Sequence, residues 1–317
     1  KGKIHKLNSG TIYEGDWMEA PLEGGYDMAE VDGPYAMNMA DWDTMGLAGL
    51  AAWYRPHLER LTSLMAKSAS VYLWNTAEGW ALLNPEMQRL GWTFRALIVW
   101  DKGVASLAGK GVEGMRTWPS VTEFCGFYQR GPNEMDLWNE WGASHPVRAW
   151  MDGERQKAAL SIKDVDRMIG VSDMARHWFT WSQWCLPSEE RYQQLRDIIP
   201  SLDRPLSELK ETHAKLWAEY RNRLELLRPT FTLPMGTSNV WNHPVVAGPE
   251  RLKDANGNAL HPCQKPLLFA ERMVQASTRP GTRVLIPFGG TCRIATYLER
   301  LKRNEPENVR YYDCCEL

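Results

Sequence analysis

The chain has 317 residues, of which 44% are hydrophobic and 24% are charged, and its net charge at pH 7 is −2. These values are typical of a soluble globular protein, and the lack of any run of eighteen apolar residues excludes a membrane-spanning helix. The net charge neither indicates nor excludes nucleic-acid binding, because such binding needs a local basic face rather than a basic chain.

The first 130 residues predict strands that alternate with helices. Short β-rich runs predict five strands, at 11–13, 26–31, 70–74, 93–100 and 121–128. Apolar residues recur at helical spacing over 47–68, and a second helical pattern over 76–90 stops at Gly91.

The middle of the chain loses its strand signals and becomes helical. Charged helical patterns cover 152–169, 173–181, 189–199 and 207–227. A loop-rich stretch then runs to Asn258, before a helix (266–277), a strand (283–287), a helix (293–303) and a last strand (308–314). We therefore predict an α/β fold with a mostly parallel twisted sheet, formed by residues 1–130 and 231–317, and a helical insertion at 131–230.

The six cysteines show neither paired zinc spacing nor a disulfide framework. The first residues also lack the apolar core of a signal peptide. We expect reduced thiols, no bound metal, no membrane contact and a cytoplasmic location.

Asp32-Gly33-Pro34-Tyr35 follows the strand predicted at 26–31 and carries three kinds of chemistry. The carboxylate accepts hydrogen bonds, the stiff Gly-Pro backbone presents a carbonyl, and the ring of Tyr35 can stack on a flat substrate. These four residues are the predicted catalytic motif.

A second chemical motif lies at the strand over 283–287, which runs into Pro287-Phe288-Gly289-Gly290-Thr291 and then a helix. Glycines at such a turn allow the backbone to approach a nucleotide-like ligand. A plain strand-to-helix turn without a ligand has the same sequence pattern. Upstream, His261-Pro262-Cys263-Gln264-Lys265-Pro266 stands directly before another helix.

Four blocks therefore occur in one order: Gly15-Asp16 at a strand end, Asp32–Tyr35, Gln264–Pro266 and Pro287–Gly290. In this order the chain resembles the β-group of S-adenosylmethionine-dependent amino-methyltransferases that act on DNA. The resemblance covers residues 8–130 and 238–317. It implies a Rossmann-like methyltransferase domain with permuted motif order, a catalytic half that comes first, and a target-recognition insertion. It also implies S-adenosylmethionine as cofactor, double-stranded DNA as partner, and a monomer or homodimer.

The resemblance also implies a role for each motif. The Asp32 carboxylate and the Gly33 carbonyl would accept hydrogen bonds from the amino group of a flipped base, while Tyr35 stacks on its ring. The cofactor-binding residues implied are Asp16 for the adenine amino group, Gln264 and Lys265 for the methionine end, Pro287, Phe288, Gly289, Gly290 and Thr291 for the cleft, and Glu316 for the ribose. From the residues alone, Asp16 can equally cap a turn and Lys265 can lie on the surface.

Three places depart from the family pattern. Gly33 stands where a proline is usual, which loosens the loop but keeps a carbonyl. Ile286 stands where an aspartate is usual, and Cys292-Arg293 replaces a glycine-threonine pair. A missing acid and an added cation would weaken binding of a cationic cofactor, or suit a more anionic one.

Residues 162–179 resemble a helix-turn-helix, with Gly170 as the turn and a second helix from Asp173 capped by Ser172. An ordinary helical hairpin is the alternative. We expect Lys163, Arg176 and His177 in this segment, and Lys102 after the strand at 93–100, to contact DNA.

The leading hypothesis is a site-specific DNA methyltransferase that acts on N6 of adenine, of the kind found in restriction-modification. Methylation of N4 of cytosine uses nearly the same chemistry and stays open. The third hypothesis is a DNA-binding homologue with impaired catalysis, suggested by Ile286 and Arg293.

Overall fold

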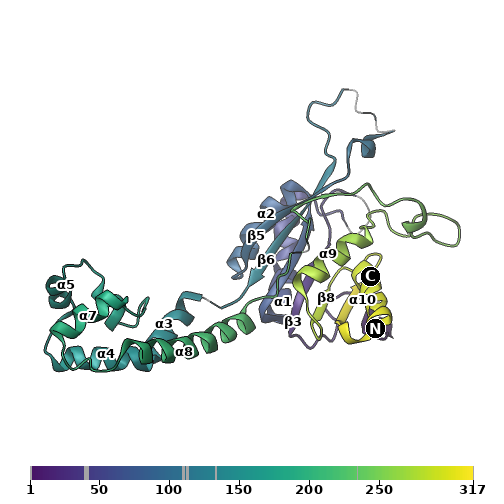
Figure 1. Ribbon diagram of the computed structural model, residues 1–317. Helices are drawn as coiled ribbons and strands as arrows, with labels where there is room; N and C mark the ends of the chain where they lie inside the picture. The colour runs from purple at the N-terminus through teal and green to yellow at the C-terminus, as the bar shows by residue number, and fades with distance from the viewer. Residues whose placement is uncertain are drawn as a thin grey trace. The chain divides into compact units, whose positions relative to one another are not determined.

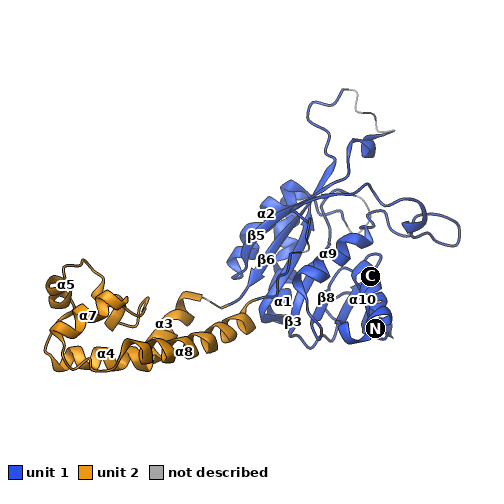
Figure 2. Ribbon diagram, viewed as in Figure 1, with its two compact units in different colours: residues 1–131, 229–317 blue, residues 132–228 orange. Residues whose placement is uncertain are grey.

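The computed structural model describes residues 2–38, 43–108, 111, 114–132, 134–233 and 235–316. The chain forms two compact units, residues 1–131 with 229–317, and residues 132–228 (Figure 2). No helix among the described residues is long and apolar enough to cross a membrane.

The first unit is built on a nine-stranded sheet with the order β1-β2-β9-β8-β3-β4-β6-β5-β7, as counted over the described residues. Five of its strand pairs are parallel, including β8 with β3 and β3 with β4, so the expectation of a mostly parallel sheet is confirmed. The strands are β1 (Ile4–Lys6), β2 (Gly10–Glu14), β3 (Tyr26–Val31), β4 (Met65–Asn75), β5 (Thr93–Asp101), β6 (Thr122–Arg130), β7 (Val240–Asn242), β8 (Arg283–Ile286) and β9 (Tyr311–Glu316).

Helices cover both faces of this sheet (Figure 1). On one face, α9 (Leu267–Ser277) and α10 (Arg293–Asn304) bury apolar side chains such as Phe269 and Leu298 against the strands. On the other, α1 (Leu47–Leu64) and α2 (Ala77–Arg89) bury Leu58 and Leu83 in a second core. Because the central strands are buried on both faces, most of their side chains are apolar. Short 3-10 helices lie at Val104–Leu107, Gly248–Glu250 and Pro306–Asn308.

The helix predicted over 47–68 is wrong at its end. α1 stops at Leu64, and Met65 already has an extended backbone at the start of β4. β4 pairs with β3 on one side and β6 on the other, and these ladders override the local helical periodicity. The short strands β1 and β7 were not predicted, since three residues carry too little pattern.

The second unit is helical and has a core of its own. Its helices are α3 (Glu134–Ser144), α4 (Pro146–Lys157), α5 (Ile162–Ile169), α6 (Ala175–Phe179), α7 (Glu189–Ile198) and α8 (Leu206–Leu227). Buried residues of this core include Phe179, Trp184 and Leu195. The helix predicted over 152–169 is wrong: Ala159 has a φ of 54°, and a capping box of Ser161 and Asp164 starts α5 as a new helix.

The expected helix-turn-helix is only partly formed. Gly170 ends α5 in the left-handed conformation, as predicted. Ser172 does not cap a helix and Asp173 has a φ of 59°, so the second helix starts at Ala175, whose backbone N–H is accepted by Asp166 Oδ1 at 2.8 Å. With five residues, α6 is about 7.5 Å long, which is short for a helix that reads a DNA groove.

Candidate functional site

The two chemical motifs meet at one edge of the sheet. Parallel pairing of Met28 with Val284 and Ala29 with Leu285 puts the ends of β3 and β8 side by side. Gly33, after β3, is so closely packed that an added Cβ would lie 2.6 Å from the Tyr54 hydroxyl and 3.1 Å from the Phe288 ring. Packing therefore favours glycine at position 33, where the resemblance makes proline usual.

Lys265 lies against the carboxylate of Asp32. Its Nζ is 2.9 Å from both Asp32 oxygens and 3.1 Å from the Tyr35 hydroxyl, which itself donates to Asp32 Oδ1 at 2.7 Å. The side chain of Lys265 is 6% exposed, so it does not lie on the surface. The structure thus joins the predicted catalytic motif directly to a residue predicted to bind cofactor.

Glu123, on β6, is a member of the site to which the sequence assigned no role. Its Oε2 is 3.0 Å from Lys265 Nζ, and its Oε1 is 2.5 Å from Lys102 Nζ. The sequence signal was the segment Thr122-Glu123-Phe124, which resembles a feature of the same methyltransferases. Lys102 is therefore held within this cluster by an ion pair, a different setting from the DNA phosphate contact expected for it.

The charges of this cluster shift the pKa of several members. Burial alone would lower the pKa of Lys265, but Asp32 and Glu123 raise it above its usual range. Burial would raise the pKa of Glu123, but Lys265 and Lys102 lower it to about 2. At the buried Glu30, two residues before Asp32, burial and repulsion from Asp32 raise the pKa to about 8. Glu30 is thus largely protonated at neutral pH, whereas Glu123 is ionised.

Aromatic rings and a rigid carbonyl complete this part of the site. The Lys265 ammonium lies 5.3 Å from the centroid of the Tyr35 ring and 5.1 Å from that of Trp74. The Pro34 carbonyl accepts hydrogen bonds from the Tyr54 hydroxyl at 3.2 Å and from Asn75 Nδ2 at 3.4 Å. The loop after β3 is therefore held by side chains from α1 and β4.

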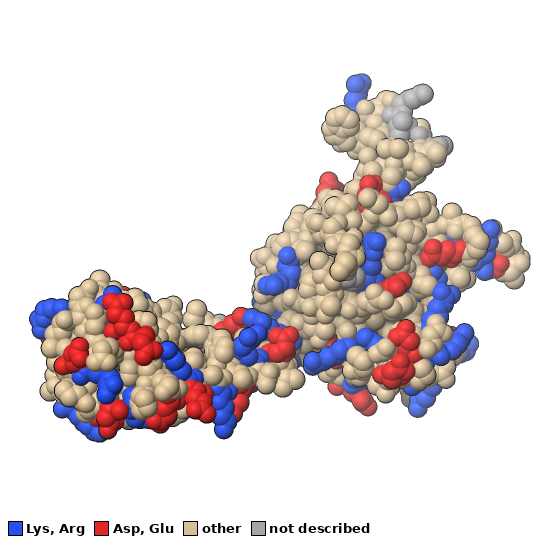
Figure 3. Space-filling model, viewed as in Figure 1, with Lys and Arg blue, Asp and Glu red and all other residues tan. Residues whose placement is uncertain are grey.

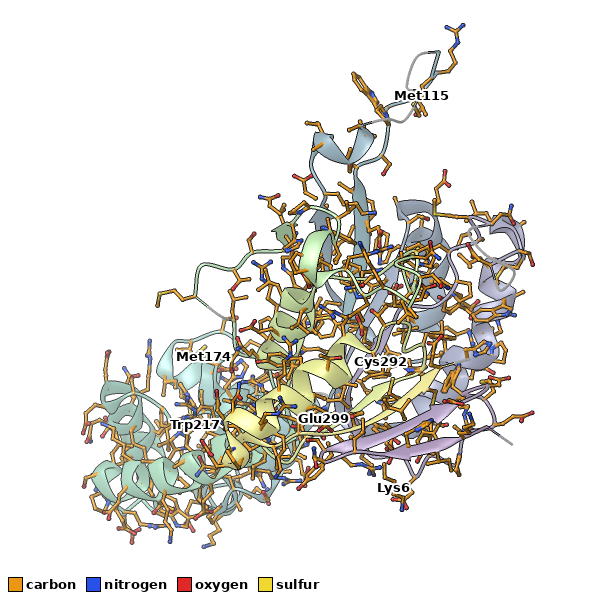
Figure 4. All side chains as sticks on the ribbon, turned by 90° about the vertical axis from the view of Figure 1, so that its right-hand side faces the viewer. Lys6, Met115, Met174, Trp217, Cys292 and Glu299 are labelled. Atoms are coloured by element: carbon orange, nitrogen blue, oxygen red, sulfur yellow. The ribbon has the colours of Figure 1, made fainter. Side chains whose placement is uncertain are left out.

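The glycine turn after β8 is hydrogen-bonded to the end of β9. Gly289 N donates to the Cys315 carbonyl at 2.8 Å, and Gly290 N donates to Glu316 Oε2 at 2.5 Å. A Cβ at Gly289 would lie 2.7 Å from Cys314 Sγ. Cys292 follows at the start of α10, where Figure 4 labels it. Glu316 thus stands beside the turn, with Pro287 buried and Thr291 half-buried in the same loop.

Asp16 reaches the same edge from β2. Gly15 N donates to the Glu316 carbonyl at 2.7 Å, so the loop that carries Asp16 adjoins Glu316. Asp16 is exposed, and its Oδ1 accepts from Met18 N at 2.9 Å, which is a turn-capping contact. Within the glycine turn, the Phe288 ring lies 6.0 Å from Trp17, which follows Asp16, and 6.0 Å from Trp53, measured between ring centroids.

Gln264 has a structural role within its own segment. The side chain is 3% exposed. Its Oε1 accepts from Leu252 N at 2.9 Å, and its Nε2 donates to the Glu250 carbonyl at 2.8 Å. Both ends of the amide are thus bonded to the backbone of the preceding loop, a setting that differs from the expected contact with the methionine end of the cofactor.

The departures at Ile286 and Arg293 are both accommodated. Ile286 is 1% exposed and lies in the core between the sheet, α9 and α10. The Arg293 guanidinium is 2.8 Å from Glu250 Oε1, which also accepts from Leu267 N at 2.7 Å. The added cation at 293 is therefore paired, and the aliphatic side chain at 286 is a core residue.

The residues expected to contact DNA in the second unit lie near its surface. Lys163 on α5 is exposed, while Arg176 Nε is 3.4 Å from Asp173 Oδ2. His177 is half-buried, with Nδ1 3.3 Å from the Gln183 carbonyl. Figure 3 shows basic and acidic side chains interspersed over the visible face of this unit. Their DNA contacts stay predictions.

Within the ranges that the structure describes, no three His, Cys, Asp or Glu side chains gather in a way that could hold a metal ion.

The sequence matches the family described as DNA methylase over residues 26–316. The type II methyltransferase M.HinfI of Haemophilus influenzae is 35% identical over 66 residues, which make up 21% of this chain and only 18% of that protein. Among solved structures, the PvuII DNA methyltransferase, described as cytosine-N4-specific, is 9% identical with a TM-score of 0.51, over 98% of this chain and 83% of that one. The M1.HpyAVI–SAM complex is 13% identical with a TM-score of 0.47, over 96% and 92%. The PvuII likeness confirms the expected fold class.

Proposed function

This chain belongs to the DNA methylase family, and from that premise we propose that it moves a methyl group from S-adenosylmethionine to an exocyclic amino group of a base in DNA. The observation that carries the proposal is the meeting of Asp32–Tyr35 with the glycine turn at one edge of the sheet. A base and a cofactor bound at these two loops would lie next to each other, as a direct transfer requires.

The residues fit the chemistry. When bound, S-adenosylmethionine supplies an electrophilic methyl group on a positively charged sulfur. The amino nitrogen of a base is a poor nucleophile, because its lone pair is delocalised into the ring. Hydrogen bonds from that amino group to the Asp32 carboxylate and the Gly33 carbonyl favour a tetrahedral nitrogen and direct its lone pair outward. This is positioning and electrostatic preorganisation, and Tyr35 would stack on the flipped base.

The cofactor proposal draws on three features of the glycine turn. Its backbone is packed so closely at Gly289 that a larger residue would meet Cys314, which suits a loop that approaches a nucleotide. Glu316 lies within hydrogen-bond distance of Gly290 and suits contact with ribose hydroxyls. The Arg293 charge is paired with Glu250, so the added cation does not argue against a cationic cofactor.

For the target we propose N6 of adenine in double-stranded DNA, because an aspartate-led motif goes more often with adenine in this family. N4 of cytosine is the alternative, and the PvuII enzyme is described as cytosine-N4-specific. The third hypothesis, a DNA-binding homologue with impaired catalysis, stays a prediction, although the pairing of Arg293 with Glu250 weakens one of its two grounds. A cytoplasmic location, a restriction-modification setting and the state of monomer or homodimer stay predictions.

The experiment is methyl transfer from labelled S-adenosylmethionine to unmethylated DNA of mixed sequence, with wild type compared with Asp32→Ala and Asp32→Asn. We expect transfer by wild type and a loss of at least about a hundredfold in both variants. Digestion of the product to nucleosides and mass spectrometry would distinguish N6-methyladenine from N4-methylcytosine. No transfer by wild type, or equal transfer by the variants, would contradict the proposal.

A further inference from the structure

One ammonium is shared by two carboxylates at the centre of the site. Lys265 Nζ lies 2.9 Å from each oxygen of Asp32 and 3.0 Å from Glu123 Oε2. The exposed fractions of the side chains are 6% for Lys265, 21% for Asp32 and 16% for Glu123. These ion pairs therefore lie in a largely dry environment, where charge interactions are strong.

This arrangement conflicts with the role proposed for Asp32. A carboxylate has about four lone-pair positions. At Asp32 both oxygens face Lys265, and Oδ1 also accepts from the Tyr35 hydroxyl at 2.7 Å. The ammonium of Lys265 adds the attraction between opposite charges to its hydrogen bonds with Asp32, and a neutral amino group lacks that attraction. A neutral amino group of a base would therefore compete poorly for Asp32 while Lys265 stays in this position.

Glu123 offers Lys265 another partner without loss of charge compensation. Its Oε2 already touches the ammonium, so a shift toward it never leaves a buried cation without an anion, which would strongly destabilise the fold. Its other oxygen is held by Lys102, whose ammonium lies 4.7 Å from the centroid of the Trp100 ring. The position of the Glu123 carboxylate is thus fixed from a second direction.

We propose that Glu123 is a positioning residue for methyl transfer. When the target amino group binds to Asp32, the Lys265 ammonium shifts toward Glu123, which becomes its partner. The inference rests on the proposed function and deepens it. Glu123 acts through Lys265 and does not touch the reacting atoms. In the arrangement described here, Lys265 occupies the acceptor that the base needs.

The kinetic test uses Glu123→Gln, Lys265→Met and the double variant, with saturating cofactor and unmethylated DNA of mixed sequence. In Glu123→Gln, Lys265 has only Asp32 to pair with. We expect kcat to fall by between about tenfold and a hundredfold, while the Kd of S-adenosylmethionine in calorimetry changes less than about twofold. Glu123→Asp, which keeps the charge, should retain more activity than Glu123→Gln. The double variant should turn over faster than Glu123→Gln, because the competing ammonium is gone.

Glu86→Gln is the matched control, since Glu86 also pairs with two cations, Arg55 and Arg89, but lies on α2. It should leave kcat unchanged. The positioning role is wrong if Glu123→Gln turns over within about twofold of wild type, or if the double variant is no faster than Glu123→Gln.

A second measurement does not depend on activity. In urea unfolding, Asp32→Asn combined with Glu123→Gln should lower the midpoint by more than the sum of the two single variants, because the pair leaves Lys265 buried and unpaired. Addition of Lys265→Met should restore part of the loss. Additive midpoints would show that the two carboxylates do not share the ammonium. If wild type transfers no methyl group, the proposed function and the positioning role are both wrong. The unfolding series still shows whether the two carboxylates share the Lys265 ammonium.

Discussion

Lys265 and Asp32 are 233 positions apart in the chain, yet the lysine ammonium lies 2.9 Å from both oxygens of the aspartate. This pairing brings together the segment before α9 and the loop after β3. It gives the lysine before α9 a role at the proposed catalytic motif, where the resemblance implied contact with the cofactor.

The packing at Gly33 predicts a steric effect. In Gly33→Ala the new Cβ would lie 2.6 Å from the Tyr54 hydroxyl, so the loop with Asp32 must shift. We expect a loss of about 1–3 kcal/mol in the free energy of unfolding, and a fall in kcat of roughly tenfold or more. Urea unfolding and methyl transfer measure the two effects.

Tyr54→Phe in the Gly33→Ala background removes the clashing hydroxyl and should recover part of the stability. The control is Gly153→Ala on α4, where an added Cβ meets nothing within 4 Å. That change should be neutral or stabilising by up to about 1 kcal/mol. Equal stability of Gly33→Ala and wild type would contradict the packing argument.

The ion pair of Arg293 with Glu250 predicts how the added cation affects the cofactor. Glu250→Gln leaves the guanidinium, 10% exposed, without its partner. We expect weaker binding of S-adenosylmethionine in calorimetry and a loss of roughly 1–3 kcal/mol of stability, less than for a fully buried pair because Glu250 is 34% exposed.

The double variant Glu250→Gln/Arg293→Met removes both charges and should bind the cofactor about as well as wild type. If Glu250→Gln alone binds with unchanged affinity, the charge at 293 does not act on the cofactor site.

Glu30 predicts a pH dependence of stability. Burial first, and then Asp32, raise its pKa from 4.5 to about 8 in the folded chain. Between these pH values the folded state binds more protons than the unfolded state, so the free energy of unfolding falls as pH rises, by up to about 1.4 kcal/mol per pH unit. Glu30→Gln lacks this titration. Its stability relative to wild type should therefore increase from pH 5 to pH 8.

Urea unfolding at several pH values measures this difference. Glu86→Gln serves as the control, because the Arg55 and Arg89 hydrogen bonds lower the pKa of Glu86 to about 2. That carboxyl is ionised in both states above pH 5, so its variant should show no such trend. A constant difference between Glu30→Gln and wild type over this range would show that Glu30 is ionised in the folded protein.

The separate core of the second unit predicts a local effect of a large substitution. Trp184 is fully buried in that core, and Trp184→Ala should cost about 3–5 kcal/mol. The first unit has cores of its own, so binding of S-adenosylmethionine should persist. Circular dichroism and calorimetry report the two effects. Leu226→Ala, at a side chain that is 69% exposed, is the control and should change neither.

The DNA contacts expected in the second unit are tested by charge reversal. Lys163→Glu combined with Arg176→Glu should weaken DNA binding and reduce the slope of log affinity against log salt by about 1 for each phosphate that the protein no longer neutralises. Lys210→Glu, in the same unit at a lysine paired with Glu189, is the control. An unchanged slope would exclude both residues from the DNA interface.

Much of the fold could be predicted from the sequence because its signals are local. The strand at 26–31 has the predicted bounds, and α9 and α10 differ by one residue at one end. Predictions failed where a distant partner decides the backbone. Residues 65–68 carry helical periodicity but belong to β4, whose Met65 pairs with Tyr26 of β3. The break at 158–161 has a local cause, because the capping box of Ser161 and Asp164 starts a new helix there.

The sequence by itself determined which loops are predicted to carry chemistry, since Asp32–Tyr35 and Pro287–Gly290 are contiguous motifs at strand ends. Only the tertiary structure decided what those loops contact and what lies beside them: Lys265 against Asp32, Phe288 and Tyr54 against Gly33, and Glu123 beside Lys265. The physical reason is that composition and periodicity are properties of neighbouring residues. Ion pairs between distant segments depend on strand order and register, which are set when both faces of the sheet are packed.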